Sequence, residues 1–564
     1  MIQFQEYLQS DYPGFASFVD TIIKPIFGDS FKPDKDYGEM VEYPEELEDF
    51  DVIENSHDEN LKKQAEDSGL ERILNLGTIK VQGGTRPIYV YDITVSKRRQ
   101  LSRNRKGIQQ LITRTLNNQS GAFMLFHYGD AKWEWRFSYK FVGKDKEDST
   151  NSKRFTYLFG RDQVCKTAAQ RFTNLLNKKG KIAFDDITEA FSVEKVSKEF
   201  FDNYRSIYAD IVCYVTGKRI VKDGNKWVEK QECEPNEFIM QQFSRFSNPE
   251  KSVRDYVKKL MGRLVFLQFI QKKGWLGVPV DDDTWTKGDK KFIQNLFASY
   301  GDKDNFIDNV LENLFNDINN RRENDIAGQW CRFFPNNNEG FKVPYLNGGL
   351  FELDPEDSTT FPLPALFMDK ILNDFFSAYN FTIDENDPSD AEVGVDPEML
   401  GRVFENLLED NKDKGTFYTP KEIVQFMCRE SLIAYLQTGA EEESKESLRQ
   451  FVTTHEVCEL RPADVFKVDK KLREVKICDP AIGSGAFPMG LLKELFDCRM
   501  AIEGIEEGVT PAEIKKDIIQ SSIYGVDIEK GAVDIARLRF WLSLVIDEQT
   551  PHALPNMDFN LYIS

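Results

Sequence analysis

Polar and apolar positions alternate in the amino-terminal third of the chain and then change to a helical spacing. Runs of β-branched and aromatic residues with a period of two predict four strands, at residues 76–81, 87–95, 122–128 and 133–139. A helix is expected at 104–117, between the second and the third of these strands. Residues 71–250 are therefore expected to form a small α/β amino-terminal domain, which also holds a polar hairpin at 218–230.

After residue 250 the apolar residues recur every three or four positions, as they do in helices. One amphipathic helix is expected over 251–275, where the apolar stripe reads as packed core rather than as a cofactor contact. Further helical segments are expected at residues 289–299, 303–320, 362–378 and 396–410. Residues 251–414 are therefore expected to be a helical connector.

At residues 475–490 an apolar run ends in Asp479, turns at a proline and passes through two glycines into a new helix. This order predicts a strand, a tight loop and a helix. The loop of residues 480–485 is called the glycine loop below. Its Gly483 and Gly485 permit positive φ, and the helix start beyond them offers unpaired N–H groups to a polar ligand.

The spacing of the glycines separates three classes of cofactor loop. A Walker loop needs a Lys-Ser or Lys-Thr pair after the glycines, and none follows here. A dinucleotide fingerprint needs an earlier third glycine than Gly490 and an acid about 20 residues on. The next strand with a terminal acid, residues 523–528 with Asp527, lies beyond a helix that a capping box opens at Thr510. S-adenosylmethionine remains as the expected cofactor.

Four segments then resemble motifs of a known family. The glycine loop and its flanks, Asp479-Pro480-Ala481-Ile482-Gly483-Ser484-Gly485-Ala486-Phe487, resemble the first motif of amino-methylating DNA methyltransferases. The segment Gly415-Thr416-Phe417-Tyr418-Thr419-Pro420 resembles the motif that precedes it in the adenine-N6 class. Residues 345–352 and 396–405 resemble the connector of type IIG restriction-modification enzymes and related phage-defence methylases. The resemblance covers residues 250–564, and it implies the first half of a Rossmann-like methyltransferase domain at 415–564.

The resemblance also implies an activity and roles for residues. The chain would be a component of a site-specific DNA adenine-N6 methyltransferase, in which N6 of a flipped adenine attacks the methyl group of S-adenosylmethionine directly. Phe417 and Tyr418 would face the sulfonium, and Thr419 would bind the carboxylate. The residues themselves predict a helix that begins near Lys421, with Thr419 as its N-cap and Pro420 at the first helical position. A plain helix cap would show the same residues around Thr419.

Two acids would hold the rest of the cofactor. Asp479 would pair with its ammonium group, and Asp527 would accept the ribose hydroxyl protons, although an acid at the end of a strand is also common without a ligand. Ile528 would pack on the adenine ring. The full set of expected cofactor-binding residues is Phe417, Tyr418, Thr419, Asp479, Pro480, Ala481, Gly483, Gly485, Phe487, Asp527 and Ile528. No catalytic residue and no metal ligand is assigned.

The residues that grip the target base are not in the sequence. Adenine methylases use Asn-Pro-Pro-Tyr for the exocyclic amine and the flipped base, and cytosine-C5 enzymes use a Pro-Cys nucleophile; neither occurs here. The chain alone is therefore expected to be inactive and to need a carboxy-terminal partner chain, or a missing segment, with that motif and a target-recognition domain. The alternative is a non-catalytic subunit that binds cofactor or double-stranded DNA and acts through a partner.

Length and composition set wider bounds. A chain of 564 residues is expected to hold three to four domains. No run of 18 uncharged apolar residues and no basic, apolar leader occurs, so a cytoplasmic location is expected. Eight cysteines without a C-x-x-C pair argue against a zinc or disulfide framework.

Charge is distributed unevenly, although the net charge of −21 looks hostile to nucleic acid. Residues 1–70 are expected to be an acidic amino-terminal segment, solvated and partly disordered over 29–70, with a DNA mimic as the less favoured interpretation. No acid lies between Asp92 and Asp130, where a phosphate track and a solvated basic helix are equally consistent with the pattern. The expected DNA-binding residues there are Arg98, Arg99, Arg103, Arg105 and Lys106.

A nuclease centre is the last candidate in this domain. Type IIG relatives often begin with a metal-dependent nuclease that needs clustered acids and a lysine. Here Asp92 is followed two residues later by Thr94 in place of the lysine, and Asp130-Ala131-Lys132 falls in an expected turn. A degenerate, nuclease-like or DNA-contacting domain is therefore expected.

Overall fold

A computed structural model describes the chain in two compact units. The first holds residues 1–200, 377–380 and 386–395, and the second holds residues 201–376, 381–385 and 396–564. The described residues are 2–56, 59, 62–63, 65, 69–82, 87–96, 121–129, 133–141, 153–223, 226–319, 329–331, 341–346, 351, 353–382, 385, 390–399, 401, 419–503, 510–552, 557 and 560–563.

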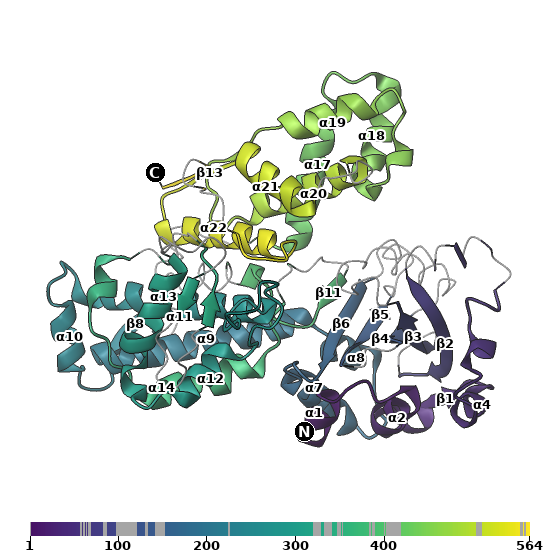
Figure 1. The fold of residues 1–564 in the computed structure, drawn as a ribbon, viewed down its shortest axis with the longest axis horizontal. Coiled ribbons are helices and arrows are strands. Elements are labelled where there is room, and N and C mark those ends of the chain that lie inside the picture. The colour runs from purple at the N-terminus through teal and green to yellow at the C-terminus, as the bar shows by residue number, and fades with distance from the viewer. Residues whose placement is uncertain are drawn as a thin grey trace. The chain divides into compact units, whose positions relative to one another are not determined.

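The first unit is built on a seven-stranded mixed sheet, in the order β1-β2-β3-β4-β5-β6-β11 (Figure 1). Its strands are β1 Phe31–Pro33, β2 Leu70–Ile79, β3 Ile88–Val95, β4 Gly121–Tyr128, β5 Glu134–Phe141, β6 Lys153–Gly160 and β11 Asp390–Glu392. Two neighbouring pairs, β3 with β4 and β6 with β11, are parallel, and the other pairs are antiparallel. The four predicted strands are confirmed, whereas the predicted helix at 104–117 lies outside the described residues.

Short helices lie along one face of this sheet (Figure 1), and aromatic side chains pack in the core of the unit. The helices are α1 Ile2–Leu8, α2 Phe15–Phe18, α3 Lys24–Phe27, α7 Lys166–Leu176 and α8 Phe184–Ala190. Phe18 packs on Phe137 with ring centroids 4.9 Å apart, and Phe137 in turn contacts Phe123 at 5.2 Å. The first pair of rings is tilted and the second is stacked, and ring pairs of these kinds stabilise a core beyond the area that they bury.

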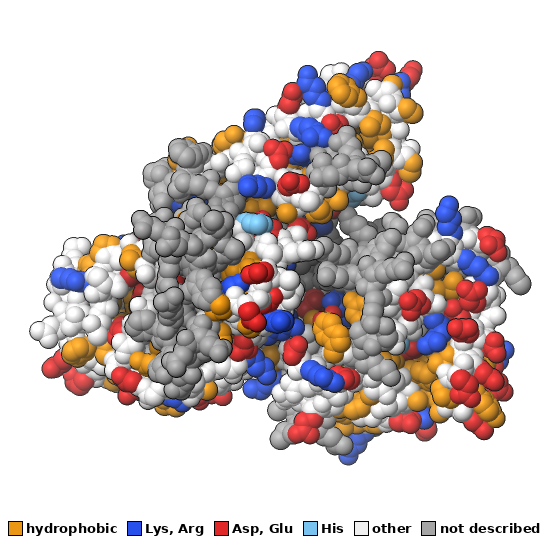
Figure 2. Space-filling view, in the orientation of Figure 1, with side chains coloured by type: hydrophobic (Ala, Val, Ile, Leu, Met, Phe, Trp, Pro, Cys, Tyr) orange, Lys and Arg blue, Asp and Glu red, His pale blue; other side chains and the backbone are white. Residues whose placement is uncertain are grey.

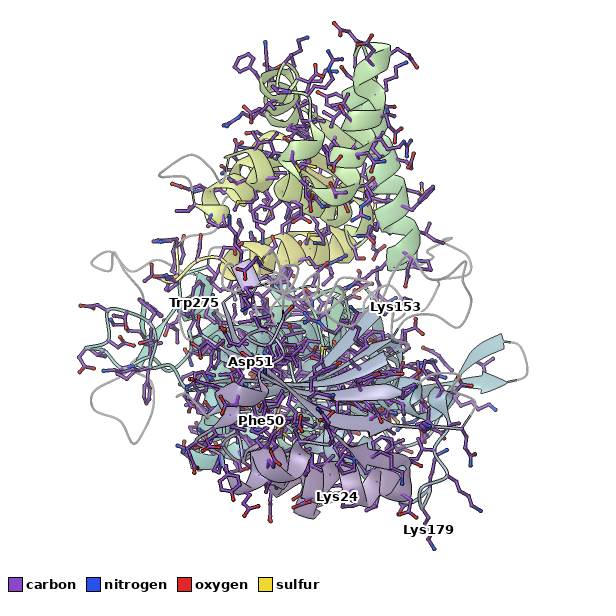
Figure 3. All side chains as sticks on the ribbon, turned by 90° about the vertical axis from the view of Figure 1, so that its right-hand side faces the viewer. Lys24, Phe50, Asp51, Lys153, Lys179 and Trp275 are labelled. Atoms are coloured by element: carbon purple, nitrogen blue, oxygen red, sulfur yellow. The ribbon has the colours of Figure 1, made fainter. Side chains whose placement is uncertain are left out.

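The acidic segment at 29–70 is folded where it is described, so the expectation of partial disorder is wrong there, although most of its described acids are exposed to solvent as predicted. It forms β1, the helix α4 (Tyr37–Glu42) and the 3-10 turn η3 (Leu47–Phe50). Asp51, labelled in Figure 3, is 2% exposed and accepts hydrogen bonds from the amides of Ile53 (3.0 Å) and Ile73 (2.9 Å). One acid thus pins the segment to β2, which acid counts alone do not reveal.

Helices make up most of the described chain between residues 193 and 375. They are α9 Val193–Thr216, α10 Glu237–Phe243, α11 Pro249–Lys273, α12 Phe292–Ser299, α13 Glu312–Asn319 and α14 Ala365–Asp369, with the π-helical segments η5 Ile307–Leu311 and η7 Lys370–Phe375. The predicted hairpin is confirmed as β7 (Lys218–Asp223) and β8 (Lys226–Gln231). A second hairpin, β9 (Gln329–Cys331) with β10 (Phe341–Val343), was not predicted.

A buried ionic network lies along α11. The Arg263 guanidinium is fully buried and donates two hydrogen bonds to Asp357, at 2.8 and 3.0 Å. Lys259 also contacts Asp357, at 3.0 Å, and Tyr256 donates to Glu312 at 3.3 Å. Burial raises the pKa of Glu312 to about 7 against the opposing effect of Arg263. This acid therefore titrates near neutral pH inside the helical core.

The carboxy-terminal part of the second unit holds a three-stranded parallel sheet in the order β12-β13-β14. Its elements are α17 Lys421–Gln437, α18 Glu442–Thr454, α19 Val465–Glu474, β12 Ile477–Asp479, α20 Ala486–Glu503, α21 Pro511–Ser521, β13 Ile523–Asp527, α22 Lys530–Val545 and β14 Leu561–Ile563. Parallel strands joined by crossover helices confirm the predicted Rossmann-like character. The predicted capping box at Thr510 is also present, with reciprocal bonds to Glu513. No helix among the described residues is both long enough and apolar enough to span a bilayer.

Replacing Glu312 with Gln should remove a pH-dependent loss of stability. The folded-state pKa lies above that of an unfolded glutamate, so the wild type keeps this contribution at low pH and loses it as pH rises through about 7. We expect the wild type to lose about 2–3 kcal/mol more than the variant between pH 5 and pH 8. Denaturant unfolding followed at both pH values measures this, with the exposed Glu474→Gln as control. Parallel pH profiles for wild type and Glu312→Gln would contradict the assignment.

Candidate functional site

The glycine loop joins β12 to α20 and folds back over the end of β13. The Ile482 amide donates to the Val526 carbonyl at 3.0 Å, and the Gly485 amide donates to the Ile482 carbonyl at 2.9 Å. Asp479, at the end of β12, accepts a hydrogen bond from the Ala481 amide at 3.1 Å. The loop therefore lies across the carboxyl ends of two parallel strands, the position at which open α/β sheets bind ligands.

Three glycines permit this close arrangement. Gly483 and Gly485 adopt φ values of 53° and 84°, as their positions in the sequence predict. Gly525, on β13 beneath the loop, is required for a different reason, because a Cβ there would lie 2.3 Å from Cδ1 of Ile482. The Ile482 side chain thus fills the space above Gly525 and seats the loop on the sheet.

Asp527 joins the second strand to the loop. Its Oδ2 accepts a hydrogen bond from the Gly483 amide at 2.8 Å, and its Oδ1 accepts one from the Glu529 amide at 3.0 Å. A carboxylate oxygen can accept more than one bond, so both oxygens keep capacity for a ligand. The next side chain, Ile528, is 75% exposed. An acid that holds the loop and an exposed apolar side chain thus stand side by side.

Helix α17 packs tightly on α20 beside the loop. A Cβ at Gly490 would lie 2.8 Å from Sγ of Cys428 and 2.9 Å from Cγ1 of Val424, so this glycine permits the close crossing. Cys428 donates to the carbonyl of Phe487 at 3.5 Å, and burial raises the pKa of its thiol to about 12. The thiol is therefore protonated at neutral pH and serves the packing of the two helices.

The predicted cap at the start of α17 is wrong by one residue. Pro420 itself occupies the N-cap position, with φ −55° and ψ 143°, and the helix begins at Lys421 without a side-chain capping bond. Thr419 is half-buried and lies before the cap. Its hydroxyl is therefore not required by the helix. Phe417 and Tyr418 lie outside the described residues.

A buried acid connects the helices behind the loop. Glu494 on α20 is 1% exposed and accepts a hydrogen bond from Nε of Arg429 at 3.0 Å. Its other carboxylate oxygen lies 3.1 Å from Nε2 of His455. His455 ends α18 with φ 58°. This cluster fixes α17, α18 and α20 to one another, and the spacing of the residues along the chain gave no sign of it.

One group of described side chains could in principle hold a metal ion. The ligand atoms of Glu456, Cys458 and Glu459 lie within 4.8 Å of one another, and all three residues are exposed. The neighbouring His455 is engaged with Glu494. Exposed acidic groups are common without an ion, so no metal site is assigned to them.

Apolar side chains are also exposed on the helices of this region. Figure 2 shows hydrophobic side chains among charged ones on the surface of the part that holds α17–α20. The exposed apolar side chains of α17 include Ile423, Phe426 and Met427, and on α19 Phe466 is 78% exposed.

In the first unit, the acid at the nuclease position is buried and engaged. Asp92 is 2% exposed, its Oδ1 accepts a hydrogen bond from the Tyr12 hydroxyl, and its Oδ2 lies 3.0 Å from Nε2 of His127. The Tyr12 ring stacks on His127 with centroids 4.1 Å apart. Burial, and after it the negative charge of Asp92, raises the pKa of the Tyr12 hydroxyl well above its ordinary value, so the hydroxyl remains a donor. Both oxygens of Asp92 thus have protein partners.

The first unit holds the other residues predicted to contact DNA or a metal ion. Asp130, Lys132 and the five basic residues Arg98, Arg99, Arg103, Arg105 and Lys106 lie outside the described residues.

The carboxy-terminal region of the second unit is similar to a known protein family. Residues 454–554 match the family described as MmeI, DNA-methyltransferase domain. A Methanocaldococcus jannaschii protein, named as a putative type II restriction enzyme and methyltransferase, is 27% identical over an alignment of 482 residues. The match covers 78% of this chain and 38% of that protein. The chain thus spans less than two fifths of the length of this relative.

Two solved structures align with low scores. The type IIL restriction-modification enzyme MmeI bound to DNA covers 65% of this chain and 39% of its own, with 15% identity and a TM-score of 0.37. The DrdV–DNA complex covers 93% of this chain and 39% of its own, with 12% identity and a TM-score of 0.27. The family match and the sequence relative confirm the predicted resemblance of this chain to restriction-modification methyltransferases.

The first unit is expected to cleave no DNA with magnesium. Asp92 is enclosed by Tyr12 and His127, and the neighbouring Thr94 provides no cation for a metal-bound water. Supercoiled plasmid incubated with Mg²⁺ and the chain should therefore stay intact, equally for wild type and Asp92→Ala. Nicking that needs the metal and disappears in Asp92→Ala or Asp130→Ala would overturn this prediction.

The Tyr12–Asp92 contact should instead be structural. Tyr12→Phe leaves a buried carboxylate oxygen without its donor, which should destabilise the first unit by about 1–3 kcal/mol. Thermal unfolding measures the loss, and Tyr43→Phe on the exposed surface is the control. An unchanged midpoint for Tyr12→Phe would contradict a structural role.

Proposed function

We propose that this chain carries the S-adenosylmethionine site of a restriction-modification DNA methyltransferase that methylates N6 of adenine. The observation that carries the proposal is the glycine loop, held across two parallel strand ends by the Gly483–Asp527 hydrogen bond. Two observations support the proposal: the loop falls within residues 454–554, which match the MmeI DNA-methyltransferase family, and Ile528 beside it is exposed.

The parts of the cofactor match groups around the loop. Asp479 would pair with the ammonium group, and the backbone of 481–485 would lie along the methionine and ribose. The remaining acceptor capacity of Asp527 suits the ribose hydroxyls, and the exposed Ile528 offers an apolar surface for the adenine ring. Thr419 would bind the carboxylate, where its hydroxyl has no capping role. When bound, the cofactor supplies the methyl group to be transferred.

Adenine N6 is proposed as the acceptor from the order of the motifs. Residues 415–420 precede the glycine loop, as they do in the adenine-N6 class that this chain resembles. A named relative is a restriction enzyme and methyltransferase, which makes double-stranded DNA the expected substrate. The basic residues Arg98, Arg99, Arg103, Arg105 and Lys106 remain the proposed DNA contacts.

A second function class is a subunit that binds cofactor or DNA without catalysing transfer. Asn-Pro-Pro-Tyr does not occur in the 564 residues, so the residues that grip the base must come from elsewhere if transfer takes place. A methylation assay separates the two. The chain alone should transfer no labelled methyl group to DNA. Co-expression with a segment that bears Asn-Pro-Pro-Tyr should yield N6-methyladenine on nucleoside analysis, whereas a purely binding subunit would yield none.

Cofactor binding is the direct test of the chain alone. Asp527→Ala removes the ribose acceptor and the Gly483 contact, which should cost about 2–4 kcal/mol and weaken S-adenosylmethionine binding tens- to hundreds-fold. Isothermal titration calorimetry measures the affinities. The matched control is Asp517→Ala, an acid that pairs with Arg499 on a neighbouring helix. Equal affinity for wild type and Asp527→Ala would sink the assignment.

A further inference from the structure

A buried arginine on α22 holds the centre of the glycine loop. Ser484 lies between the two positive-φ glycines and is 1% exposed. Its carbonyl accepts a hydrogen bond from Nη1 of Arg539 at 2.9 Å. A buried carbonyl in a loop needs such a donor, because it has no ladder partner. The bond fixes the plane of the 484–485 peptide and, with it, the direction in which the loop amides point.

The arginine is held in turn by the connector. Its Nε and Nη2 donate to the two carboxylate oxygens of Glu385, at 2.7 and 3.0 Å. Burial lowers the pKa of the guanidinium, but Glu385 and more distant acids outweigh this and raise it above its ordinary value. The guanidinium is therefore always charged, and its planar set of N–H donors has a fixed geometry. This one group bonds to Glu385 of the connector and to Ser484 of the glycine loop.

A second connector contact reaches the same place. A Cβ at Gly401 would lie 2.6 Å from Oγ and 3.0 Å from Cβ of Ser484. The absence of a side chain at Gly401 therefore allows the connector to pack closely against the glycine loop. In the segment before it, Asp396 accepts from Nζ of Lys421 at 3.0 Å, and Glu398 forms an ion pair with the same amine. Lys421 is the first residue of α17. The connector thus contacts both the glycine loop and the helix that follows Thr419.

We infer that Arg539 is a positioning residue for the glycine loop, and that Glu385 holds it in place, so cofactor affinity depends on connector residues that do not touch the cofactor. The inference rests on the proposed function of the loop. The connector regulates that site through Arg539, which bonds to Glu385 and to the Ser484 carbonyl. When Glu385 is displaced, Arg539 is no longer held and releases the Ser484 carbonyl. The 484–485 peptide then rotates, and the loop amides lose their alignment.

The test combines cofactor affinity with local hydrogen exchange on the full chain. Arg539→Gln should weaken S-adenosylmethionine binding at least tenfold by calorimetry, and Glu385→Gln should weaken it several-fold. Arg539→Lys restores the charge beside Glu385 but cannot donate to Ser484 and to both carboxylate oxygens at once, so it should recover stability more than affinity. Exchange of the amides at 482–485 should accelerate in all three variants, while the amides of β13 keep their protection.

Arg499→Gln is the matched control. Arg499 is also a buried arginine, paired with Asp517 at 2.6 Å, and it lies about 20 Å along α20 from the loop. It should lose stability without losing affinity. Unchanged affinity and unchanged loop exchange in Arg539→Gln, or equal weakening by Arg499→Gln, would overturn the inference.

Failure of the proposed function would give a different result. If the wild type binds no S-adenosylmethionine, the assignment of the cofactor fails, and loop exchange alone decides the role of Arg539. Faster exchange confined to 482–485 would still support it, and uniform exchange across β12, β13 and α22 would refute it. Should Arg539→Gln not fold, Glu385→Gln and Arg539→Lys provide the same comparison.

Discussion

The hydrogen bond from the Gly483 amide to the Asp527 carboxylate is the contact on which the candidate site depends. It joins the loop after one strand to the end of the next, and it can form only because Gly483 adopts φ 53°. The loop can pack this closely on β13 because Gly525 has no side chain and leaves room for Ile482. A single carboxylate therefore orders the loop and still has capacity to accept a further hydrogen bond. Affinity lost on its removal includes loss of loop order.

The surroundings of the loop show how a mostly helical region supports it. Gly490 brings α17 against α20, and Glu494 binds α17 and α18 through Arg429 and His455. On the other side, the Arg539 guanidinium ties the loop to Glu385. Buried acids with two cationic or donor partners are costly to disturb, because removal of one partner leaves a charge without compensation. The loop is thus enclosed by polar contacts that a hydrophobic core alone would not supply.

The glycine loop could be predicted from its own local sequence, whereas the residues that hold it in place could not. An apolar run that ends in Asp479, with glycines at 483 and 485, marks a strand and a tight turn whatever surrounds it. The strands of the first sheet were predictable for the same reason, because alternation along one strand reports one buried face. The cap at Thr419 was misplaced by one residue, since a Thr-Pro pair fits two registers of a helix start.

Contacts between distant segments left no such local pattern. Glu385 and Arg539 stand 154 residues apart, and Asp51 is a buried anchor within an acidic run that looks solvated by composition. Tyr12 reaches Asp92 across 80 residues, so the enclosure of the nuclease-position acid also depends on the fold. Each of these pairs is set by tertiary packing, which sequence spacing does not encode.

The central claim is that the glycine loop and the end of β13 bind S-adenosylmethionine. The most direct measurement is ultraviolet crosslinking of the chain to cofactor labelled in its methyl group, followed by proteolysis and mass spectrometry of the labelled peptides. The label should map to peptides that contain residues 415–421, 479–487 or 527–528, and unlabelled S-adenosylhomocysteine should displace it. Label confined to other peptides, or label that the competitor does not displace, would contradict the account.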